Sequence, residues 1–572
     1  MAKTLPKNQE VAEQLELLAD LLELEGEPSF RVIAYRRAAT RIRETPGSVA
    51  QLALDGAAKE LPGIGKTIEE KIVQIVDDGE MHALTKRKGL IPPEVVTFMR
   101  LPGLGPKSAA KIWKELGITT VADLRAAAEA EQLRTLSGFG ARTEERILHA
   151  LSQEAKVEPV RPLLGAGLAP VLAVVQVLRE HPAADLVSEA GSVRRRKETF
   201  RDLDVIATAK DPRALIDYFV ALDWVAEITA HGDTKATVVS HDSLRFDLRV
   251  VPPESFGNLL QHFTGSKDHN VALREAAVKK GLSISEYGVK TVESGEVFTT
   301  RDEAELYEFL GYQYIPPELR ENLGELDAAR KGELPELVDV KQVRGDLHVH
   351  STWSSDGKNT IEEMARRSIE RGYQYMAITD HSHYLREGRL EAQWREVEQL
   401  NDRLAPFRIL RGIEANIRAN GEIDVAEELL AQLDWVVASL HQAFDKNPTE
   451  RIISAMEHPY VHCIGHPTAR KINKRGPADV DIELVIEKAL ETKTFLELNS
   501  QPDRLDLRDV NARRAAEAGL KVPVDTDAHQ LSALDWMEIG IAQARRAWLT
   551  KDQVLNTRTW KQVEKLKKKK KS

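Results

Sequence analysis

The stretches GSVRRRKETFRDLDV (residues 191–205) and RFDLRVV (residues 245–251) decide the fold of the middle of this chain. Both contain apolar and charged residues in alternation, which is typical of a half-buried strand because successive side chains of a strand point to opposite faces. Asp202 and Asp204 therefore share the polar face of the first strand, and Asp247 lies on the polar face of the second. The pattern predicts neighbouring strands of one sheet whose surface carries three carboxylates.

These carboxylates predict a metal-dependent site. Three acidic groups on one surface repel one another unless cations lie between them, and Mg²⁺ or Mn²⁺ prefers oxygen ligands. Two such ions can hold the attacking and leaving oxygens of a phosphoryl transfer. Gly191 and Ser192 stand where a strand turns, so N–H groups and a hydroxyl can approach a triphosphate, whose charge the following arginines neutralise. We expect a site that joins nucleotides; the alternative is a solvated strand edge beside a surface charge run.

The wider sequence around these strands resembles the palm of family X DNA polymerases, the group that includes the repair polymerase beta. The stretches that extend the resemblance are HGDTKATVV (231–239), FTGS (263–266), HNVALR (269–274) and ISEYGV (284–289). Agreement over this length favours the nucleotide-joining interpretation. The chain departs from the family at Arg196, where a glycine is usual, and at His262, where a tyrosine is usual. Because His262 borders the sugar, the choice between deoxynucleotides and ribonucleotides stays open.

The resemblance implies a role for each matching residue. Asp202, Asp204 and Asp247 would hold two ions of magnesium or manganese, with Asp247 closest to the primer 3′-hydroxyl. The residues implied to bind the nucleotide are Gly191, Ser192, Arg195, Phe263, Gly265 and Asn270. The residues implied to contact DNA are Lys235 and Arg274. The expected partners are gapped or primer-template DNA and dNTPs.

One pattern occurs three times near the start of the chain, as ELPGIGKTIEEKI (60–72), RLPGLGPKSAAKI (100–112) and TLSGFGARTEERI (135–147). In each copy an apolar residue stands between two glycines, and a helix is expected to begin directly afterwards. The glycines allow a tight turn, and the N–H groups of the following helix can face a DNA phosphate without reading base sequence. We predict helix-hairpin-helix motifs that bind the DNA backbone through Gly63, Gly65, Gly103, Gly105, Gly138 and Gly140.

The stretch AYRRAATRIRETPGSV (34–49), together with the first hairpin, resembles the small amino-terminal domain of polymerase beta. In that family the domain holds the 5′-phosphate side of a gap, and a lysine forms a Schiff base with an abasic sugar. Lys71 falls at the matching position, and a nucleophilic lysine must first lose its proton. Phe30 stands where polymerase beta has a histidine. We predict gap binding and leave open lyase activity, because Lys71 can equally be an exposed helix lysine.

From about residue 343 the sequence alternates short apolar strands with amphipathic helices, which is typical of parallel β/α units. Seven strands can be counted, and ionisable residues stand at or beyond the ends of six; FLELNS (495–500) is the exception. The carboxyl ends of barrel strands meet at one mouth, so these residues should form a multinuclear metal site. The nine candidates are His348, His350, Asp356, His381, Glu414, His441, His466, Asp527 and His529. This imidazole-rich set suits manganese, zinc or iron, and a metal-bound hydroxide can attack a phosphodiester.

This region resembles the PHP domain, the polymerase and histidinol phosphatase family. The resemblance implies a distorted barrel of seven β/α units with three metal ions, two of them bridged by Glu414. Bacterial family X polymerases carry such a domain at the carboxyl end, with a manganese-favouring 3′–5′ exonuclease and in some cases abasic-site or 3′-phosphate cleavage. The substrate of this domain stays open at the level of sequence.

A chain of 572 residues is too long for one core, so several domains of α+β and α/β class are expected. The expected order is a helical helix-hairpin-helix domain (1–85), a fingers-like helix-hairpin-helix domain (86–158), a nucleotidyltransferase palm with mixed sheet (159–260), a thumb-like subdomain (261–318), a linker (319–342) and a PHP barrel with a basic tail (343–572).

The single cysteine, Cys463, excludes an internal disulfide, and no stretch approaches the roughly 20 apolar residues of a membrane span. We expect a soluble, cytoplasmic, nucleoid-associated monomer.

The net charge of −10 argues against a nucleic-acid-binding protein when it is averaged over the chain. The average hides a local excess of positive charge, because residues 191–201 hold five basic groups and one acidic group. The tail KLKKKKKS, from Lys565, is either a solubilising end or a nonspecific phosphate contact.

Three functions are consistent with these features. We favour a template-directed, gap-filling DNA repair polymerase with an additional metal-dependent 3′–5′ exonuclease or phosphoesterase in the PHP domain. The first alternative is a DNA end-processing nuclease whose polymerase half mainly positions DNA, which is favoured if Arg196 and His262 weaken nucleotide binding. The second is a noncatalytic scaffold that binds DNA ends, against which the complete acidic sets at both sites argue.

Overall fold

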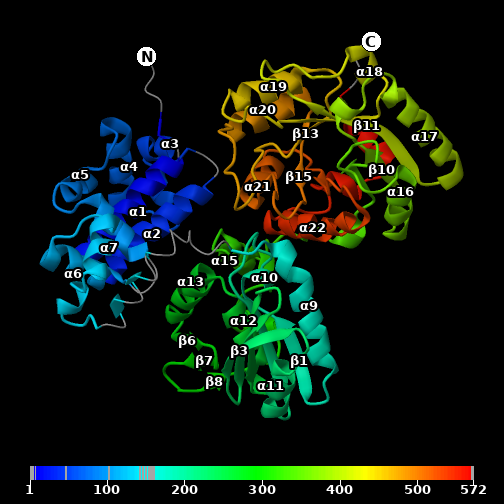
Figure 1. Ribbon diagram of the computed structural model, residues 1–572. Helices are drawn as coiled ribbons and strands as arrows, with labels where there is room; N and C mark the ends of the chain where they lie inside the picture. The colour runs from blue at the N-terminus through cyan, green and yellow to red at the C-terminus, as the bar shows by residue number, and fades with distance from the viewer. Residues whose placement is uncertain are drawn as a thin grey trace. The chain divides into compact units, whose positions relative to one another are not determined.

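The computed structural model describes residues 5–6, 8–45, 48–100, 104–140, 143–144, 147–148, 151 and 161–568 (Figure 1). The chain divides into two compact units, Met1–Val160 and Arg161–Ser572. Among the described residues, no helix is both long and apolar enough to cross a membrane.

The first unit is helical wherever its residues are described. Its helices are α1 (Asn8–Glu25), α2 (Ser29–Glu44), α3 (Val49–Leu54), α4 (Lys66–Asp78), α5 (His82–Lys88), α6 (Pro106–Leu116) and α7 (Val121–Glu129), with 3₁₀ turns at Ala58–Glu60, Pro93–Arg100 and Leu133–Thr135. One apolar core joins them, in which Leu15, Ile72 and Phe98 are fully buried. The helical front predicted from the sequence is confirmed.

The repeated glycine pattern forms the expected turns. Gly65 is the N-cap of α4, and Gly105 is the N-cap of α6. The apolar residue between the glycines is buried in every copy, as Ile64, Leu104 and Phe139. Each turn is therefore anchored to the core through its middle residue, while the described glycines of the turns are exposed.

The first and third turns share two further features. Gly63 and Gly138 have φ angles of +85° and +89°, a region that glycine adopts without strain. In each case a buried glutamate in the following segment accepts a hydrogen bond from the backbone N–H ten residues earlier, at 2.9 Å for Glu69 and 3.1 Å for Glu144. The carboxylates fix both turns from the core side, and Glu69 also lies 3.8 Å from Lys59 Nζ.

The second unit begins with a five-stranded sheet and its helices. These are α9 (Leu164–Glu180), β1 (Ala184–Glu189), α10 (Gly191–Arg194), β2 (Leu203–Ala209), α11 (Pro212–Val220), β3 (Val225–His231), β4 (Lys235–Ser240) and β5 (Arg245–Val251). The strand order is β1-β2-β5-β4-β3, in which β2 and β5 are parallel and the other neighbours antiparallel. Asp204 stands opposite Asp247 in the parallel pair. The mixed sheet predicted for this region is confirmed.

A smaller helical and β region follows the sheet. It contains α12 (Phe256–Thr264), α13 (Lys267–Val278), β6 (Leu282–Ser285), β7 (Gly288–Thr291), β8 (Val297–Phe298), α14 (Glu303–Phe309) and α15 (Glu325–Lys331). Segment 319–342, which we expected to be a linker, includes α15 and the fully buried Arg320 and Glu325. Arg320 lies 2.5 Å from Glu303, and Glu325 lies 2.7 Å from His269. Since buried charges need such partners, this segment packs firmly onto its thumb-like neighbour.

The carboxyl-terminal region is built on short parallel strands. They are β9 (Gly345–Val349), β10 (Tyr375–Ile378), β11 (Arg408–Asn416), β12 (Trp435–Ser439), β13 (Cys463–Gly465), β14 (Phe495–Leu496), β15 (Leu498–Asn499) and β16 (Val524–Asp525). Strands β14 to β9 form one sheet, and β15 pairs with β16. A bridge from Val349 to Ala528 brings β16 beside β9, so the sheet curls toward a barrel. The parallel β/α architecture is confirmed, with the predicted FLELNS strand split at Glu497.

Helices cover the outside of this curled sheet (Figure 1). They are α16 (Ile361–Glu370), α17 (Arg389–Leu404), α18 (Glu427–Leu430), α19 (Pro448–Glu457), α20 (Ile482–Thr492), α21 (Asp509–Glu517) and α22 (Met537–Arg546). The last helix, α23 (Trp560–Leu566), packs instead on the opposite face of the strands, where Trp560 shares a core with Trp435. Two apolar residues of the region, Leu505 and Ile539, belong to the core of the five-stranded sheet. Arg470 also pairs with Glu198 of the sheet region at 2.5 Å. The two parts of this unit therefore share a packed interface.

Candidate active sites

The three predicted aspartates meet on the polar face of β2 and β5. The Nε atom of Arg245 lies 3.5 Å from an oxygen of Asp202 and 3.5 Å from an oxygen of Asp247. Thr237 donates a hydrogen bond to Asp247. Burial, followed by the charges of Asp247 and Asp202, raises the pKa of Asp204 to about 6. The group thus has the mutual repulsion that bound cations relieve.

The turn after β1 is fixed to β2, the strand that carries Asp204. Gly191, with a φ of +64°, and Ser192 begin α10. The N–H of Ala190 donates to the backbone oxygen of Asp204 at 2.8 Å. The structure therefore places the turn expected to approach a triphosphate directly beside the acidic group.

A pocket of about 390 Å³ opens beside this turn. Its lining residues are Arg195, His262, Phe263, Gly265, Lys267, Asn270, Val271 and Arg274. Asn270 donates to the backbone oxygen of His262 at 2.8 Å, and Arg274 lies 3.0 Å from His262 Nδ1. His262, one of the two departures from the family, thus lines the pocket expected to hold the nucleotide, whereas Arg196 does not line it. Lys267 adds a third cation to Arg195 and Arg274. A pocket with this charge suits a triphosphate.

A smaller cavity of about 60 Å³ adjoins the aspartates. Its lining residues include Asp204, Lys235, Asp247, Arg249 and Phe263. The Arg249 guanidinium lies 4.5 Å from the centre of the Phe263 ring. Lys235 therefore lines the same cavity as Asp204 and Asp247.

The hairpin glycines face open space. No atom lies within 4 Å of the place where a Cβ would stand on the described members Gly63, Gly65, Gly105, Gly138 and Gly140. Gly103 lies outside the described residues. Such open turns at helix starts leave room for a phosphate group.

Lys71 is half-buried on α4. Burial, followed by the positive charge of Arg31, lowers the pKa of Lys71. Phe30, which replaces the family histidine, is 74% exposed. The lowered pKa favours the neutral amine that Schiff-base chemistry requires.

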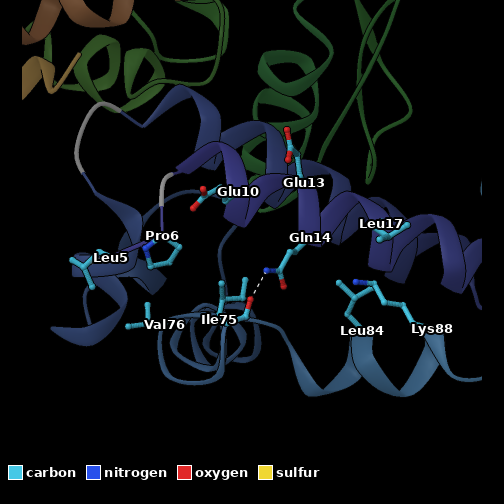
Figure 2. Close-up of a pocket in the computed structure, with 11 residues that line it drawn as sticks. Leu5, Pro6, Glu10, Glu13, Gln14, Leu17, Ile75, Val76, Leu84 and Lys88 are labelled. Carbon is cyan, nitrogen blue, oxygen red and sulfur yellow. Dashed lines mark hydrogen bonds between the residues drawn. The ribbon is translucent and has the colours of Figure 1, made fainter. Parts of the chain in front are cut away.

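A pocket of about 660 Å³ lies elsewhere in the first unit, against α1, α4 and α5 (Figure 2). Leu17, Ile75 and Leu84 contribute an apolar wall. Gln14 bridges the helices by donating to the backbone oxygen of Gly79 at 2.8 Å. None of its described lining residues belongs to a group that could hold a metal ion.

The nine residues expected at the barrel mouth meet around Glu414. Its carboxylate lies 2.8 Å from His381 Nδ1, 3.1 Å from His441 Nε2 and 3.1 Å from His466 Nε2. It also lies 3.5 Å from His348 Nε2. One carboxylate that faces four imidazoles has the geometry of a bridging ligand.

Two aspartates complete the cluster. Asp527 lies 3.1 Å from His350 Nε2 and 3.7 Å from His529 Nδ1. Asp356 lies 3.3 Å from His381 and 3.4 Å from His529. Three overlapping groups have ligand atoms within 4.8 Å of one another: His350, His381 and His529; His348, His350 and Glu414; His381, Glu414 and His441.

The chemistry of this cluster fits metal ions. Buried polar atoms normally have partners, yet His348 Nε2, His350 Nε2 and Glu414 Oε2 have no hydrogen-bond partner among the described residues. Burial, with the charge of His529, lowers the pKa of His350 to about 3, so this imidazole is neutral and can bind a metal. Several such orphaned atoms that point at one space are the arrangement that a multinuclear metal site requires.

Comparison with known proteins identifies both halves of the chain. Matching family models are a helix-hairpin-helix domain (residues 6–81), a SAM-like helix-hairpin-helix tandem (96–153), a DNA polymerase beta thumb (259–321) and a PHP domain (346–496). The DNA polymerase/3′-5′ exonuclease PolX of Bacillus subtilis is 39% identical over 561 residues, which cover 96% of this chain and 97% of that protein. The chain belongs to the family X DNA polymerases.

Two other relatives match separate parts of this family X polymerase. DNA polymerase lambda of Rattus norvegicus is 26% identical over 347 residues, which cover 55% of this chain and 56% of that protein. A probable phosphatase of Thermoanaerobacter sp. is 33% identical over 239 residues, which cover 39% of this chain and 95% of that protein. The predicted family and the predicted PHP domain are both confirmed.

Sequence reasoning missed the residues that hold the metal-binding imidazoles of the polymerase's PHP domain. Glu497, in the strand that seemed to lack a ligand, accepts a hydrogen bond from His348 Nδ1 at 2.6 Å. Asn416 accepts one from His441 Nδ1 at 2.6 Å. Such partners fix the ring orientation and the tautomer of a ligand. The alternation of residues in FLELNS places Glu497 on the side of the barrel mouth. This alternation was the sequence feature that could have predicted a role for Glu497 at the metal site.

The rim of the PHP cluster is basic. Arg504 Nε lies 3.7 Å from Asp527 Oδ2, and the Arg504 side chain is 14% exposed. Gln501 accepts hydrogen bonds from Arg504 and from Lys471, each at 3.4 Å. These two cations lie beside the cluster, and Lys471 also pairs with Asp503 at 2.9 Å.

Proposed function

We propose that this family X polymerase fills short gaps in DNA at the palm site and removes 3′-terminal nucleotides at the PHP cluster. The juxtaposition of Asp204 and Asp247 in the β2–β5 pair carries the first assignment. The second is supported by the convergence of nine metal-ligand side chains and by the name of the Bacillus subtilis relative, which combines both activities.

At the palm site, Asp202, Asp204 and Asp247 would hold two ions of magnesium or manganese. When bound, these ions supply the positive charge that stabilises the attacking and leaving oxygens. Arg195 and Lys267 bind the triphosphate from the pocket beside them. The protein thereby positions the primer end and the nucleotide, which is the main requirement of phosphoryl transfer.

In the neighbouring pocket, Phe263 and Gly265 border the sugar and base, and Asn270 reaches the base edge. Ser192 contacts the triphosphate at the turn. Arg274 contacts the template strand, while Lys235 contacts a DNA phosphate near the aspartates. His262 forms the wall beside the sugar, and we expect it to govern the choice between deoxynucleotides and ribonucleotides.

At the PHP cluster, we propose three ions of manganese, zinc or iron held by the nine converging residues. When bound, they supply an activated water for phosphodiester cleavage. Glu414 would be a ligand shared by two of the ions, and Glu497 orients His348. Arg504 and Lys471 neutralise the phosphate of the strand that enters the cluster.

We propose that the two helical domains, residues 1–85 and 86–158, hold the DNA backbone on either side of a gap. The palm (159–260), thumb (261–318) and PHP region (343–572) then act on its ends, and segment 319–342 joins the last two. Support comes from the open hairpin glycines and from the two helix-hairpin-helix matches.

A gapped duplex labelled at the 5′ end of its primer tests the division of labour. We expect the wild-type protein to extend the primer with dNTPs in magnesium and to shorten it without dNTPs in manganese. Asp247→Ala should lose primer extension and keep shortening. His350→Ala should keep primer extension and lose shortening. Absence of extension by the wild-type protein would contradict the polymerase assignment, and shortening by His350→Ala would place the nuclease outside the PHP cluster.

A further inference from the structure

The loop that carries Arg195 has an unusual backbone. Arg196, which stands where the family usually has glycine, has a φ of +57°. Residues other than glycine rarely adopt this left-handed backbone conformation and are strained in it. The loop therefore needs external contacts to hold its conformation.

Those contacts come from α22 of the PHP region. Gln543 Nε2 donates to the backbone oxygen of Arg196 at 2.7 Å, and Arg546 Nη1 donates to the backbone oxygen of Arg195 at 2.8 Å. Gln543 is fully buried and Arg546 is 5% exposed. Two consecutive carbonyl groups of the palm loop are thus held by donors from a helix some 350 residues later in the chain, at sequence separations of 347 and 351.

The same helix is tied to the side chain of Arg195 through a shared carboxylate. Glu321 lies 3.1 Å from Arg195 Nε and 3.0 Å from Arg546 Nη1. Asp509 of α21 neutralises the other side of Arg546 at 2.7 Å. Arg195 in turn donates to the backbone oxygen of Thr264 and lines the nucleotide pocket. The direction in which Arg195 points is therefore set jointly by the thumb and by α22.

We propose that α22 is a structural part of the polymerase's triphosphate site, with Gln543 and Arg546 as positioning residues. They hold the backbone of Arg195 and Arg196 so that the Arg195 guanidinium stays aimed into the nucleotide pocket. The inference rests on the proposed role of Arg195 in nucleotide binding. It gives the PHP region a second task, independent of its own metal cluster, as a support for nucleotide binding in the palm.

Gln543→Leu tests this proposal, because leucine keeps the approximate volume of glutamine and removes the donor to Arg196. We expect the KM for dNTP on a gapped primer to rise on the order of tenfold, with kcat within about twofold, as for loss of a contact that acts on binding. Shortening of a 3′ end in manganese without dNTPs should stay at the wild-type rate, because Gln543 does not touch the PHP cluster.

Arg545→Gln is the matched control. Arg545 is on the same helix and crosses the same interface, but it binds Glu318 at 2.7 Å and the backbone oxygen of Val338 at 3.1 Å, not the loop. We expect its dNTP KM to stay within about twofold of wild type. An equal rise of KM in Arg545→Gln would show general loosening of the interface and would overturn the proposal.

Arg196→Gly supplies the second control. Glycine adopts a positive φ without strain, so in this background Gln543→Leu should raise the dNTP KM by less than about threefold. The proposal is overturned if Gln543→Leu leaves KM unchanged in the otherwise wild-type chain, or if the rise is undiminished in the Arg196→Gly background. Failure of the wild-type protein to extend primers would instead remove the polymerase function on which the inference rests.

Discussion

Gly191 lies so close beneath Asp204 that a Cβ atom on Gly191 would overlap the Asp204 carboxylate. Gly191 also has a φ of +64°, where a side chain would be strained. The turn that approaches the triphosphate and the strand that presents the aspartates can therefore share one site only while this residue is glycine.

Gly191→Ala should lower the rate of primer extension on the order of 100-fold and leave the nuclease rate unchanged. The methyl group must displace either α10 or Asp204, and a misplacement of about 1 Å at an active site costs on the order of 100-fold in rate. Primer extension and manganese-dependent shortening by the same preparation measure the two activities. Gly295→Ala is the control for backbone strain alone, because Gly295 has a φ of +76° and nothing within 4 Å of its Cβ position. Extension by Gly191→Ala at the wild-type rate would contradict this account.

Asp204→Asn should stabilise the metal-free protein at neutral and alkaline pH. Burial and the charges of Asp247 and Asp202 raise the pKa of Asp204 to about 6, so the folded state binds this proton more tightly than the unfolded chain does. The wild-type protein therefore loses stability as the pH rises from about 4 to about 6. The difference of about two units between the folded and unfolded pKa of Asp204 lowers the free energy of unfolding by about 3 kcal/mol at most.

Thermal unfolding in EDTA at pH 5 and pH 8 measures this effect. The asparagine variant should have a higher Tm than wild type at pH 8, with a smaller difference at pH 5. Saturating Mg²⁺ should remove the advantage, because the ion compensates the charge in the wild-type protein and cannot bind as well to the amide. A Tm gain that is independent of pH would show that charge repulsion is not its source.

The sequence predicted the sites better than it predicted their connections. Alternating residues were sufficient to place Asp202, Asp204 and Asp247 on one sheet face, because strand periodicity is a local property. The pairing of Arg470 with Glu198 joins positions 272 residues apart, and no local pattern encodes it. The same holds for the α22 contacts with Arg195.

Glu497 shows a second reason why the sequence alone does not predict the whole site. Its strand is broken into β14 and β15, and its carboxylate accepts a hydrogen bond from the buried His348 as well as from the N–H of His466 at 2.6 Å. A glutamate in a buried strand is visible in the sequence, but its partners depend on how the sheet curls. Segment 319–342 was hard to interpret for the same reason, since the partners of the buried Arg320 and Glu325 are Glu303 and His269, which lie outside the segment.

Glu497→Gln should weaken metal binding at the PHP cluster by about 10- to 100-fold, which is the usual cost of losing a partner of a ligating histidine. The amide keeps the shape of the side chain but holds His348 less strongly. Chelator competition followed by metal analysis measures the affinity, and primer extension in magnesium should be unaffected. Glu491→Gln, at an exposed position of α20, should bind metal like wild type. Unchanged affinity in Glu497→Gln would show that His348 needs no such support.

Lys71 should form a Schiff base with a 5′-terminal abasic sugar, at a rate that rises with pH. Burial and the charge of Arg31 lower the pKa of Lys71, so the neutral amine becomes the main form at a lower pH than for an ordinary lysine. Borohydride reduction should trap a covalent complex between the wild-type protein and DNA that carries such a sugar. Lys71→Ala should give no complex, and Lys86→Ala, an exposed lysine of α5, should give the wild-type yield. A covalent complex that still forms with Lys71→Ala would assign the reaction to another amine. If Lys71→Ala forms no complex but still binds gapped DNA, then Lys71 acts in the chemistry and the hairpins supply the phosphate contacts.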